Sequence, residues 1–366
     1  MSEWKNVKLG DILTLQRGHD LPKSQMKPGN IPVAGSNGII GYHDDSTTKA
    51  PGVTIGRSGN LGNAHLYTKD FWAHNTTLYV KDFKENDQIF VYYLLKSINF
   101  KQFNVGSAVP TLNRNHIHPL PINLPPLPEQ KAIAEVLSSL DDKIDLLHRQ
   151  NKTLEAMAET LFRQWFVEKA DESWEEKSLS FFGEIVCGKT PSKKRKEFHD
   201  GSIPFIKIPD MHHKTFVFST VDTLTEEGKN SQIKKTLPEK SICVSCIATV
   251  GLVTFTTEES HTNQQINSII PFKSHYRYYL YLQMRSSYDL LHALASGGTA
   301  TLNLNTGNFS KINIPLPGDK KLKEFHNSVE PKFDKIYSNQ KQIITLKKLR
   351  DTLLPKLMSG KVRVEI

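Results

Sequence analysis

One short pattern in the sequence has the form of a nuclease site. Asp210 follows Pro209, and further along the chain Glu227 and Lys229 enclose a glycine. Two carboxylates and a lysine in this order would hold Mg²⁺ and polarise a water molecule for attack on a phosphate. The pattern is short and its spacing is variable, so it often arises without function. We favour a structural role, in which Asp210 ends a strand and residues 226–229 form an exposed turn.

Two of the three cysteines have half the ligand spacing of a zinc ribbon. Cys243 and Cys246 are separated by two residues, no second pair follows, and Cys187 is far away in sequence. Residues three apart in a strand point to opposite faces, so two small buried side chains explain the pair better than metal ligands. His212 and His213 are possible further ligands, but an exposed or DNA-facing pair explains them equally well. We therefore expect no metal site.

The sequence gives no sign of methyl-transfer or nucleophilic chemistry. No glycine-rich strand-to-helix loop suits S-adenosylmethionine, and Asn123 with the Leu-Pro-Pro that follows lacks the adjacent aromatic residue of an amino-methyltransferase motif. The prolines there indicate a linker. No Ser-His-Asp or Cys-His set stands out. We expect a chain that is not an enzyme and has no cofactor of its own.

The charge of the chain favours a polyanionic partner. Its 366 residues include 47 Lys and Arg and 38 Asp and Glu, a net charge of +9. Phosphate contacts require Lys and Arg, whereas base contacts also use Asn, Gln, Ser and Thr. A solvated surface loop explains a basic run equally well. The candidate DNA contacts are Arg57, Ser58, Asn60, Asn113, Arg114, Asn115 and His116 in the first half, and Lys189, Lys193, Lys194, Arg195, Lys196, Lys207, His212, His213 and Lys214 in the second.

Length and composition are those of a globular protein with two or three domains. Three cysteines give no disulfide framework and fit a reducing cytoplasm. No apolar stretch is long enough to cross a bilayer, and residues 1–13 lack the core of a signal peptide. We expect a cytoplasmic protein that does not bind a membrane.

The second half of the sequence repeats the first. The order of the matches is preserved while their offset drifts, as expected of a divergent duplication. The matches are Trp4, Leu9 and Gly18 with Trp174, Leu179 and Gly188 at an offset of 170, residues 111–113 and 122–125 with 301–303 and 312–315 at 190, and residues 142–144 with 334–336 at 192. The sequence therefore predicts two related bodies.

Each repeat begins with short apolar runs separated by glycine-rich turns, which predicts strands, and ends in a long amphipathic helix. In both helices the apolar steps alternate between four and three residues, as in a heptad seam. The first seam is Ile133, Leu137, Leu140, Ile144, Leu147, Asn151, Leu154, Ala158, Leu161 and Trp165, with Phe162 and Phe166 beside its end. The second is Phe325, Val329, Ile336, Ile343, Leu346, Leu353 and Leu357, interrupted by Lys332, Asn339 and Arg350.

The net charges of the segments indicate how the helices pair. Residues 1–128 carry +4, residues 129–172 carry −4, residues 173–318 carry +3 and residues 319–366 carry +6. Opposite charges beside a seam favour pairing, so we expect an antiparallel intramolecular pair rather than a coiled-coil homodimer. Asn151 would fix its register.

These observations predict an α+β fold with two strand-rich bodies and two long antiparallel heptad helices. The boundaries are those of the four charge segments. The aromatic end of the first helix, Phe162, Trp165 and Phe166, occupies the positions of Leu354, Leu357 and Met358 in the repeat and is a candidate docking surface, although simple packing also explains it.

Several segments resemble the specificity subunits of type I restriction–modification enzymes. Residues 315–319 depart from the fuller proline-leucine-proline-glutamate-glutamine run of that family, which leaves the start of the second helix open. Residues 124–147 and 158–168 resemble the family's central conserved region, residues 349–364 its C-terminal conserved region, residues 7–18 and 187–210 the entry to its recognition domains, and residues 53–67 a glycine-rich stretch within them.

The resemblance implies a division of labour among subunits. Each strand-rich body would be a target-recognition domain for one half of a split, asymmetric site in double-stranded DNA. The helices would dock two methyltransferase subunits, which methylate adenine with S-adenosylmethionine, and restriction subunits would translocate and cleave DNA with ATP and Mg²⁺. Two alternatives remain: a coiled-coil scaffold without affinity for DNA, and a related fusion or nicking system that uses the same kind of subunit.

Overall fold

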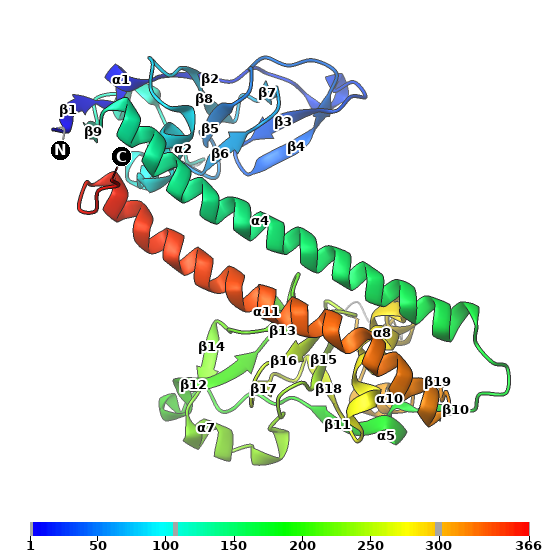
Figure 1. Ribbon diagram of the computed structural model, residues 1–366. Helices are drawn as coiled ribbons and strands as arrows, with labels where there is room; N and C mark the ends of the chain where they lie inside the picture. The colour runs from blue at the N-terminus through cyan, green and yellow to red at the C-terminus, as the bar shows by residue number, and fades with distance from the viewer. Residues whose placement is uncertain (1–2, 105–108, 297–301, 366) are drawn as a thin grey trace. The chain divides into compact units, whose positions relative to one another are not determined.

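The computed structural model describes residues 3–104, 109–296 and 302–365. Thr301, part of one repeat match, lies outside the described residues. The chain forms two compact units, which we call unit 1 (residues 1–145 and 344–366) and unit 2 (residues 146–343). The division falls inside both long helices, so each unit contains one strand-rich body and one end of each helix (Figure 1). The four-segment domain boundaries stay a prediction.

Unit 1 contains a four-stranded antiparallel sheet in the order β2-β8-β5-β6, a three-stranded sheet β4-β3-β7 and the pair β1-β9. Helix α2 packs on β5 and β6. The elements are β1 (Lys5–Lys8), α1 (Leu9–Ile12), β2 (Thr14–Arg17), η1 (Lys23–Gln25), β3 (Ile31–Gly35), β4 (Gly38–His43), β5 (Gly52–Gly56), β6 (Ala64–Tyr67), β7 (Trp72–Ala73), β8 (Thr77–Asp82), α2 (Gln88–Ser97), η2 (Phe100–Phe103), α3 (Arg114–Ile117) and β9 (Pro121–Leu124).

Unit 2 contains a five-stranded sheet in the order β11-β18-β15-β16-β13, a three-stranded sheet β14-β12-β17 and the pair β10-β19. Its elements are β10 (Glu176–Ser178), α5 (Leu179–Phe182), β11 (Gly183–Cys187), η4 (Lys196–Phe198), β12 (His199–Ile206), α6 (Ile208–Met211), β13 (Phe216–Val217), β14 (Asp222–Leu224), α7 (Glu226–Asn230), η5 (Ile233–Lys235), β15 (Ile242–Ser245), β16 (Val253–Thr256), β17 (His261–Thr262), β18 (Ile266–Pro271), η6 (Ser274–Tyr276), α8 (Arg277–Ser286), α9 (Tyr288–Ala295), α10 (Thr306–Ser310) and β19 (Asn313–Pro315). No helix of the described residues is long and apolar enough to cross a bilayer.

The strand pairs that close the two bodies correct the alignment of the repeat. In unit 1, Val7 lies opposite Ile122; in unit 2, Lys177, 170 positions after Val7, lies opposite Ile314. Ile122 is therefore equivalent to Ile314, at an offset of 192, and the predicted offset of 190 is wrong for this strand. A shift of two residues keeps every side chain on the same face of a strand, so the sequence pattern matches almost equally well at both offsets.

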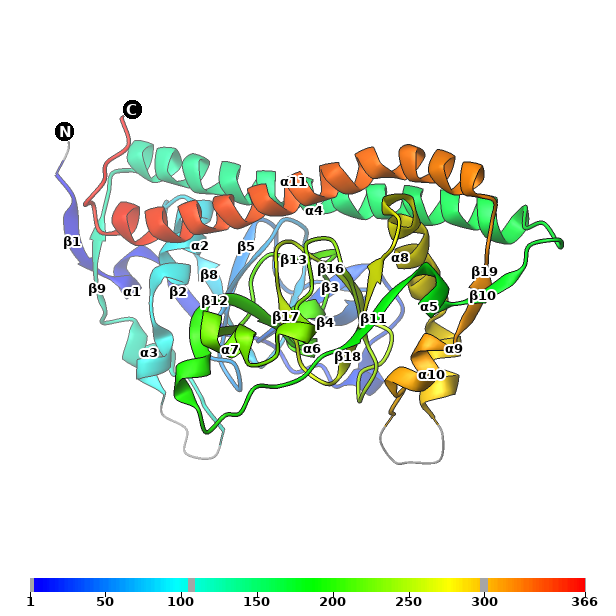
Figure 2. The ribbon, with the colours of Figure 1, turned by 90° about the horizontal axis from the view of Figure 1, so that it is seen from below.

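The two long helices are α4 (Leu127–Arg163), continued by the π-helical turn η3 (Gln164–Glu168), and α11 (Asp319–Met358). Within unit 1, Asp141 of α4 accepts a hydrogen bond of 2.5 Å from Arg350 of α11. Within unit 2, the ring centroids of Phe166 and Phe325 are 4.8 Å apart. Residue numbers rise along α4 as they fall along α11, which confirms the predicted antiparallel pair (Figure 2).

The start of α11, which the sequence left open, is held by ion pairs. The Asp319 carboxylate lies 2.8 Å from Lys323 Nζ, 3.0 Å from Lys273 Nζ and 2.8 Å from His275 Nε2. Hydrogen bonds from Lys323, Lys273 and His275 hold the pKa of Asp319 well below its usual range. A carboxylate in the first turn also favours the helix dipole, so the glycine-aspartate sequence starts the helix without the fuller family run.

The predicted seams are the buried stripes of both helices. None of their members is exposed, and Leu140, Leu154, Leu161, Trp165, Leu346 and Leu353 are the half-buried ones. The helix ends share a core with the body of their own unit: Ile133, Leu137, Leu354 and Leu357 in unit 1, and Ala158, Phe162, Phe325, Val329 and Ile336 in unit 2.

A polar contact lies in the seam of unit 2. The Asn339 side-chain amide donates a hydrogen bond of 2.9 Å to the side-chain oxygen of Asn151. Asn339 is 0% exposed and Asn151 is buried as well. Asn151 was expected to fix the register, and the structure supplies its partner, one of the polar residues that interrupt the second seam.

We predict that Asn339→Leu lowers the free energy of unfolding by about 1–3 kcal/mol, because it leaves the buried Asn151 amide without its partner. The double variant Asn151→Leu/Asn339→Leu should recover most of this loss, since it removes both polar groups. Urea unfolding of the three proteins measures both effects. A double variant less stable than Asn339→Leu would contradict this account of the pair.

Candidate nucleic-acid interface

In unit 1 the two predicted groups of DNA contacts come together. The loop after β5, which begins at Arg57, is joined to the segment before α3: the backbone N–H of Leu112 donates to Arg57 O at 2.8 Å, and that of Gly59 donates to Pro110 O at 3.1 Å. Ser58 forms a bridge with Thr111. Residues from distant parts of the sequence thus form one small surface, which we call the paired loops of unit 1 (residues 57–60 and 110–116).

The polar side chains of the paired loops are only partly engaged. Arg57, half-buried, donates to Asn75 O at 3.3 Å, and the exposed Asn60 donates to the Asn37 side chain at 2.5 Å. Asn113 caps α3 by accepting from the Asn115 backbone at 3.0 Å. Arg114 donates to Leu15 O at 3.2 Å but, like Asn115 and His116, it remains exposed. Gly59 has φ +81° and nothing within 4 Å of an added Cβ, so its backbone is open to a ligand.

Unit 2 contains an equivalent pair of loops that the sequence prediction missed. Leu304 N–H donates to Cys246 O at 2.8 Å, and Ala248 N–H to Leu302 O at 3.0 Å. The turn is the same in both units: Gly62 donates to Gly56 O, and Gly251 donates to Ser245 O, at 2.8 and 2.9 Å. In the sequence, the correspondence of Gly62 with Gly251 was the signal that could have located this second pair of loops. At the offset of 189 that these hydrogen bonds set, positions 247–249 carry Ile, Ala and Thr instead of Ser58, Gly59 and Asn60, so this loop offers apolar contacts.

The basic run of unit 2 is a solvent-exposed strip. The Lys189 backbone is tied to Thr262 O at 3.0 Å, and the Arg195 guanidinium lies 5.3 Å from the Phe198 ring centroid. Such a strip offers phosphates a set of cations for which the described part of the chain provides no ion pair. The exposed residues are Lys189, Lys193, Lys194, Arg195 and Lys196.

The second basic group of unit 2 is less available. Lys207 is half-buried and forms an ion pair with Asp222, so its charge is already neutralised. His212 and His213 are exposed, with ring centroids 6.1 Å apart, and Lys214 is half-buried. Among the described residues no hydrogen bond or ion pair joins this group to the basic run.

The nuclease pattern has structural partners. Asp210 is buried, and its carboxylate accepts hydrogen bonds from the backbone of Lys207 at 2.9 Å and of Val221 at 3.1 Å. Lys229 pairs with Glu226 at 3.0 Å and with Glu259 at 2.7 Å. The Asp210 carboxylate therefore serves backbone amides. The expected strand end and exposed turn are wrong, because Asp210 lies in the short helix α6 and residues 226–229 lie in the short helix α7.

Cys243 and Cys246 are core residues of unit 2, whereas Cys187 is half-buried. Burial raises the pKa of the Cys243 thiol to about 12 and that of the Cys246 thiol to about 11, which disfavours the thiolate that binds metals. Within residues 3–104, 109–296 and 302–365, no three His, Cys, Asp or Glu side chains are grouped as metal ligands.

The aromatic end of α4 divides between core and surface. Phe162 and Phe166 are buried in the core of unit 2 and pack against Tyr279 and Phe325, so packing accounts for most of their surface; a part in docking stays a prediction. Trp165 remains half-exposed.

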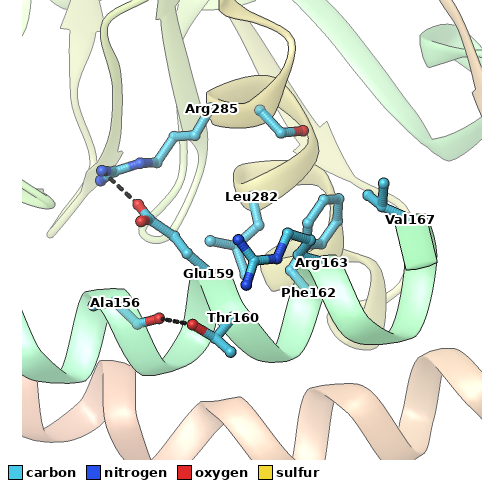
Figure 3. A pocket seen from close by; sticks show the side chains of 9 residues that line it. Ala156, Glu159, Thr160, Phe162, Arg163, Val167, Leu282 and Arg285 are labelled. Atoms are coloured by element: carbon cyan, nitrogen blue, oxygen red, sulfur yellow. Dashed lines mark hydrogen bonds and ion pairs between the residues drawn. The ribbon is translucent and has the colours of Figure 1, made fainter. Parts of the chain in front are cut away.

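Beside this end a groove of about 630 Å³ lies between α4 and α8 (Figure 3). Arg285 of α8 reaches Glu159 of α4 at 2.8 Å, and Arg163 pairs with Glu168 at 3.0 Å. Val167 is 58% exposed. The apolar floor includes Phe162 and Leu282, and the charged side chains form a rim.

Comparison with known proteins identifies the class. The family described as "Type I restriction modification DNA specificity domain" matches residues 1–156 and 171–350. The specificity subunit of the type I restriction enzyme HindI from Haemophilus influenzae is 38% identical over 331 residues, covering 70% of this chain and 72% of that one. The specificity subunit of MjaIX from Methanocaldococcus jannaschii is 30% identical over 303 residues, covering 75% and 69%.

A solved structure shares the fold. The crystal structure of the S subunit of a type I restriction–modification system from M. genitalium has a TM-score of 0.69 and 17% identity, and covers 97% of this chain and 96% of that one. The chain therefore belongs to the type I restriction–modification DNA specificity family. This confirms the resemblance and the expected class, a DNA sequence-specificity subunit.

We predict that Asp210→Ala lowers stability by about 1–3 kcal/mol, because two partly buried backbone amides lose their acceptor, and that it leaves DNA cleavage by the assembled restriction complex unchanged. Asp210→Asn, which keeps one acceptor oxygen, is the matched control. Loss of cleavage in a folded, DNA-binding Asp210→Ala complex would support the nuclease alternative instead.

Proposed function

We propose that the chain recognises a split, asymmetric sequence in double-stranded DNA, with one half contacted by unit 1 and the other by unit 2. The observation that carries this proposal is the paired-loop surface, present once in each unit on the same backbone hydrogen bonds and with different side chains. Equivalent positions with different chemistry would recognise different base sequences.

In unit 1 the paired loops supply donors and acceptors for base edges. Arg57 and Arg114 suit guanine, and Asn60 suits adenine, by the usual bidentate geometries. In unit 2 the equivalent loop offers Ile247, Ala248 and Thr249, whose methyl groups suit contacts with thymine methyls. The exposed basic run of unit 2 supplies phosphate contacts that position the domain without specifying sequence.

We further propose that catalysis lies in partner subunits. Two methyltransferase subunits with S-adenosylmethionine would methylate adenine at the bound site, and restriction subunits with ATP and Mg²⁺ would translocate and cleave DNA in the cytoplasm. The groove beside α4 supports docking, because an apolar floor with a charged rim is typical of protein–protein interfaces. A nicking or fusion system would use the same surfaces, and its partner subunits would distinguish it.

We predict that affinity for duplex DNA falls steeply with salt, because bound phosphates release counterions. Lys193→Gln/Lys194→Gln should reduce the slope of log K against log [salt] by up to about 0.9 per lost phosphate contact. Lys347→Gln/Lys348→Gln, which removes two exposed charges of α11, should leave the slope unchanged. A flat salt response of the unaltered protein would favour the scaffold alternative.

We predict that Val167→Glu reduces co-purification of the methyltransferase subunit by roughly tenfold or more, equivalent to about 1.4 kcal/mol, because it places a charge in the apolar part of the groove. Val221→Glu, at a residue of unit 2 that is 88% exposed, is the control and should retain the partner. Equal recovery of methyltransferase with both variants, each of unchanged stability, would rule out docking at this groove.

A further inference from the structure

Both long helices begin beside a tryptophan and the segment that follows the other helix. In unit 1, Glu129 in the first turn of α4 accepts a hydrogen bond of 3.1 Å from Trp4 Nε1. It also accepts two from the Arg363 guanidinium, one of them at 2.6 Å. The guanidinium lies 5.3 Å from the Trp4 ring centroid. Glu129 is 1% exposed, so its charge depends on Arg363.

Unit 2 has the same arrangement with the charges exchanged. Trp174 is equivalent to Trp4, and at the offset of 192 Lys321 is equivalent to Glu129 and Asp171 to Arg363. The Lys321 ammonium lies 4.4 Å from the Trp174 ring centroid. Hydrogen bonds from Ser173 and the charge of Lys321 hold the pKa of Asp171 below its usual range. Each helix start therefore meets a tail of opposite sign, negative on positive in unit 1 and positive on negative in unit 2.

We propose that this exchange of charge makes the pairing of the two halves of the chain selective. Residues 1–172 fit residues 173–366, and neither half fits a second copy of itself. Because the two halves are repeats of one fold, the backbone of each half would allow it to pair with a second copy of itself. The contacts at the helix ends distinguish the two cases.

The mismatch in a pair of identical halves is specific. Two copies of residues 1–172 would bring Glu129 against Asp171, and two copies of residues 173–366 would bring Lys321 against Arg363. In the first case the buried Glu129 charge loses its partner and meets a like charge, which is strongly unfavourable. In the second case two half-buried cations repel each other. The net charges agree, because residues 129–172 carry −4 and residues 319–366 carry +6.

The seam gives the same result independently. At the offset of 192, the position of Asn339 in the first half is Leu147, and that of Asn151 in the second half is Ile343. A pair of first halves would therefore set Asn151 against Leu147, and a pair of second halves would set Asn339 against Ile343. In both cases a buried amide loses its hydrogen bond, which costs more than an apolar contact returns.

The Asp141–Arg350 contact of unit 1 follows the same rule. The positions of Arg350 and Asp141 in the other half are Ala158 and Phe333. In pairs of identical halves Asp141 would meet alanine and Arg350 would meet phenylalanine. Three polar contacts along the helix pair are therefore satisfied only when different halves meet.

The test uses full-length protein with a protease site inserted between Glu172 and Ser173, in an exposed segment, and cleaved after purification. A normal batch and an isotopically heavy batch are mixed, and native mass spectrometry identifies the pairs. Mixed light–heavy pairs of unlike halves report that exchange has occurred. For the unaltered sequence we expect exchange among unlike halves without pairs of identical halves.

Two variants reduce the selectivity and leave the Asp141–Arg350 contact in place. Glu129→Arg/Arg363→Glu retains the ion pair of unit 1 but gives both helix ends the same polarity, so pairs of identical halves become attractive at their ends. Adding Asn151→Ile/Asn339→Leu makes the seam equivalent in both halves. We expect the fraction of pairs that consist of identical halves to rise roughly tenfold with the first variant and roughly tenfold again with the second.

A matched control restores the selectivity. Adding Lys321→Glu/Asp171→Arg to Glu129→Arg/Arg363→Glu reverses both ends, so unlike halves should again pair exclusively. Pairs of identical halves at statistical proportions in the unaltered protein would overturn the proposal. The proposal would also be overturned if unlike halves still paired exclusively in the variant that combines Glu129→Arg/Arg363→Glu with Asn151→Ile/Asn339→Leu. If that variant fails to fold, exclusive pairing of unlike halves in Glu129→Arg/Arg363→Glu alone would overturn the proposal.

Discussion

The apolar seam between α4 and α11 is the constraint on which the rest of the structure depends. Each helix carries a long stripe of Leu, Ile and aromatic side chains, whose exposure to water is unfavourable. Burial of such apolar surface stabilises the folded state by roughly 25 cal/mol per Å². In each unit the helix ends also complete the core of the strand-rich body. The body is therefore fixed to the seam by shared packing, and its loops are held by a folded framework.

Duplication explains how one framework serves two domains. The closing strand pairs and the paired loops repeat the same backbone hydrogen bonds in both units. What differs is the side chains placed on them: Ser58 and Asn60 in one unit, Ile247 and Thr249 in the other. A specificity subunit requires this separation, because recognition residues must vary while the packing that positions them persists.

Much of the fold followed from the sequence because it rests on local periodicity. The heptad spacing located both helices, and the opposite segment charges indicated their pairing. Asn151 was recognised as a seam residue, but its partner Asn339 was not, because the antiparallel register depends on contacts between distant residues. The offset of 190 failed at β9 and β19 because a two-residue shift preserves strand alternation.

The candidate DNA contacts were harder to predict than the helices. The sequence favoured charged and polar residues, so it named Arg57 and Arg114, whose loops the structure joins, and also Lys207, whose charge is taken by Asp222. It also missed residues 247–249, which contain no charge. Their equivalence to the unit 1 loop depends on backbone hydrogen bonds between segments far apart in the chain, a relationship that composition cannot show.

The central claim is that the two units recognise separate halves of one DNA site. The most direct measurement exchanges residues 1–124, closed by the β1–β9 pair, for the same domain of another specificity subunit, and determines the methylated sequence of the complex assembled with its methyltransferase. The account predicts that one half of the methylated sequence changes while the other half and the unspecified bases between them persist. If a folded chimera bound to its methyltransferase changes both halves together, the two-domain account is contradicted.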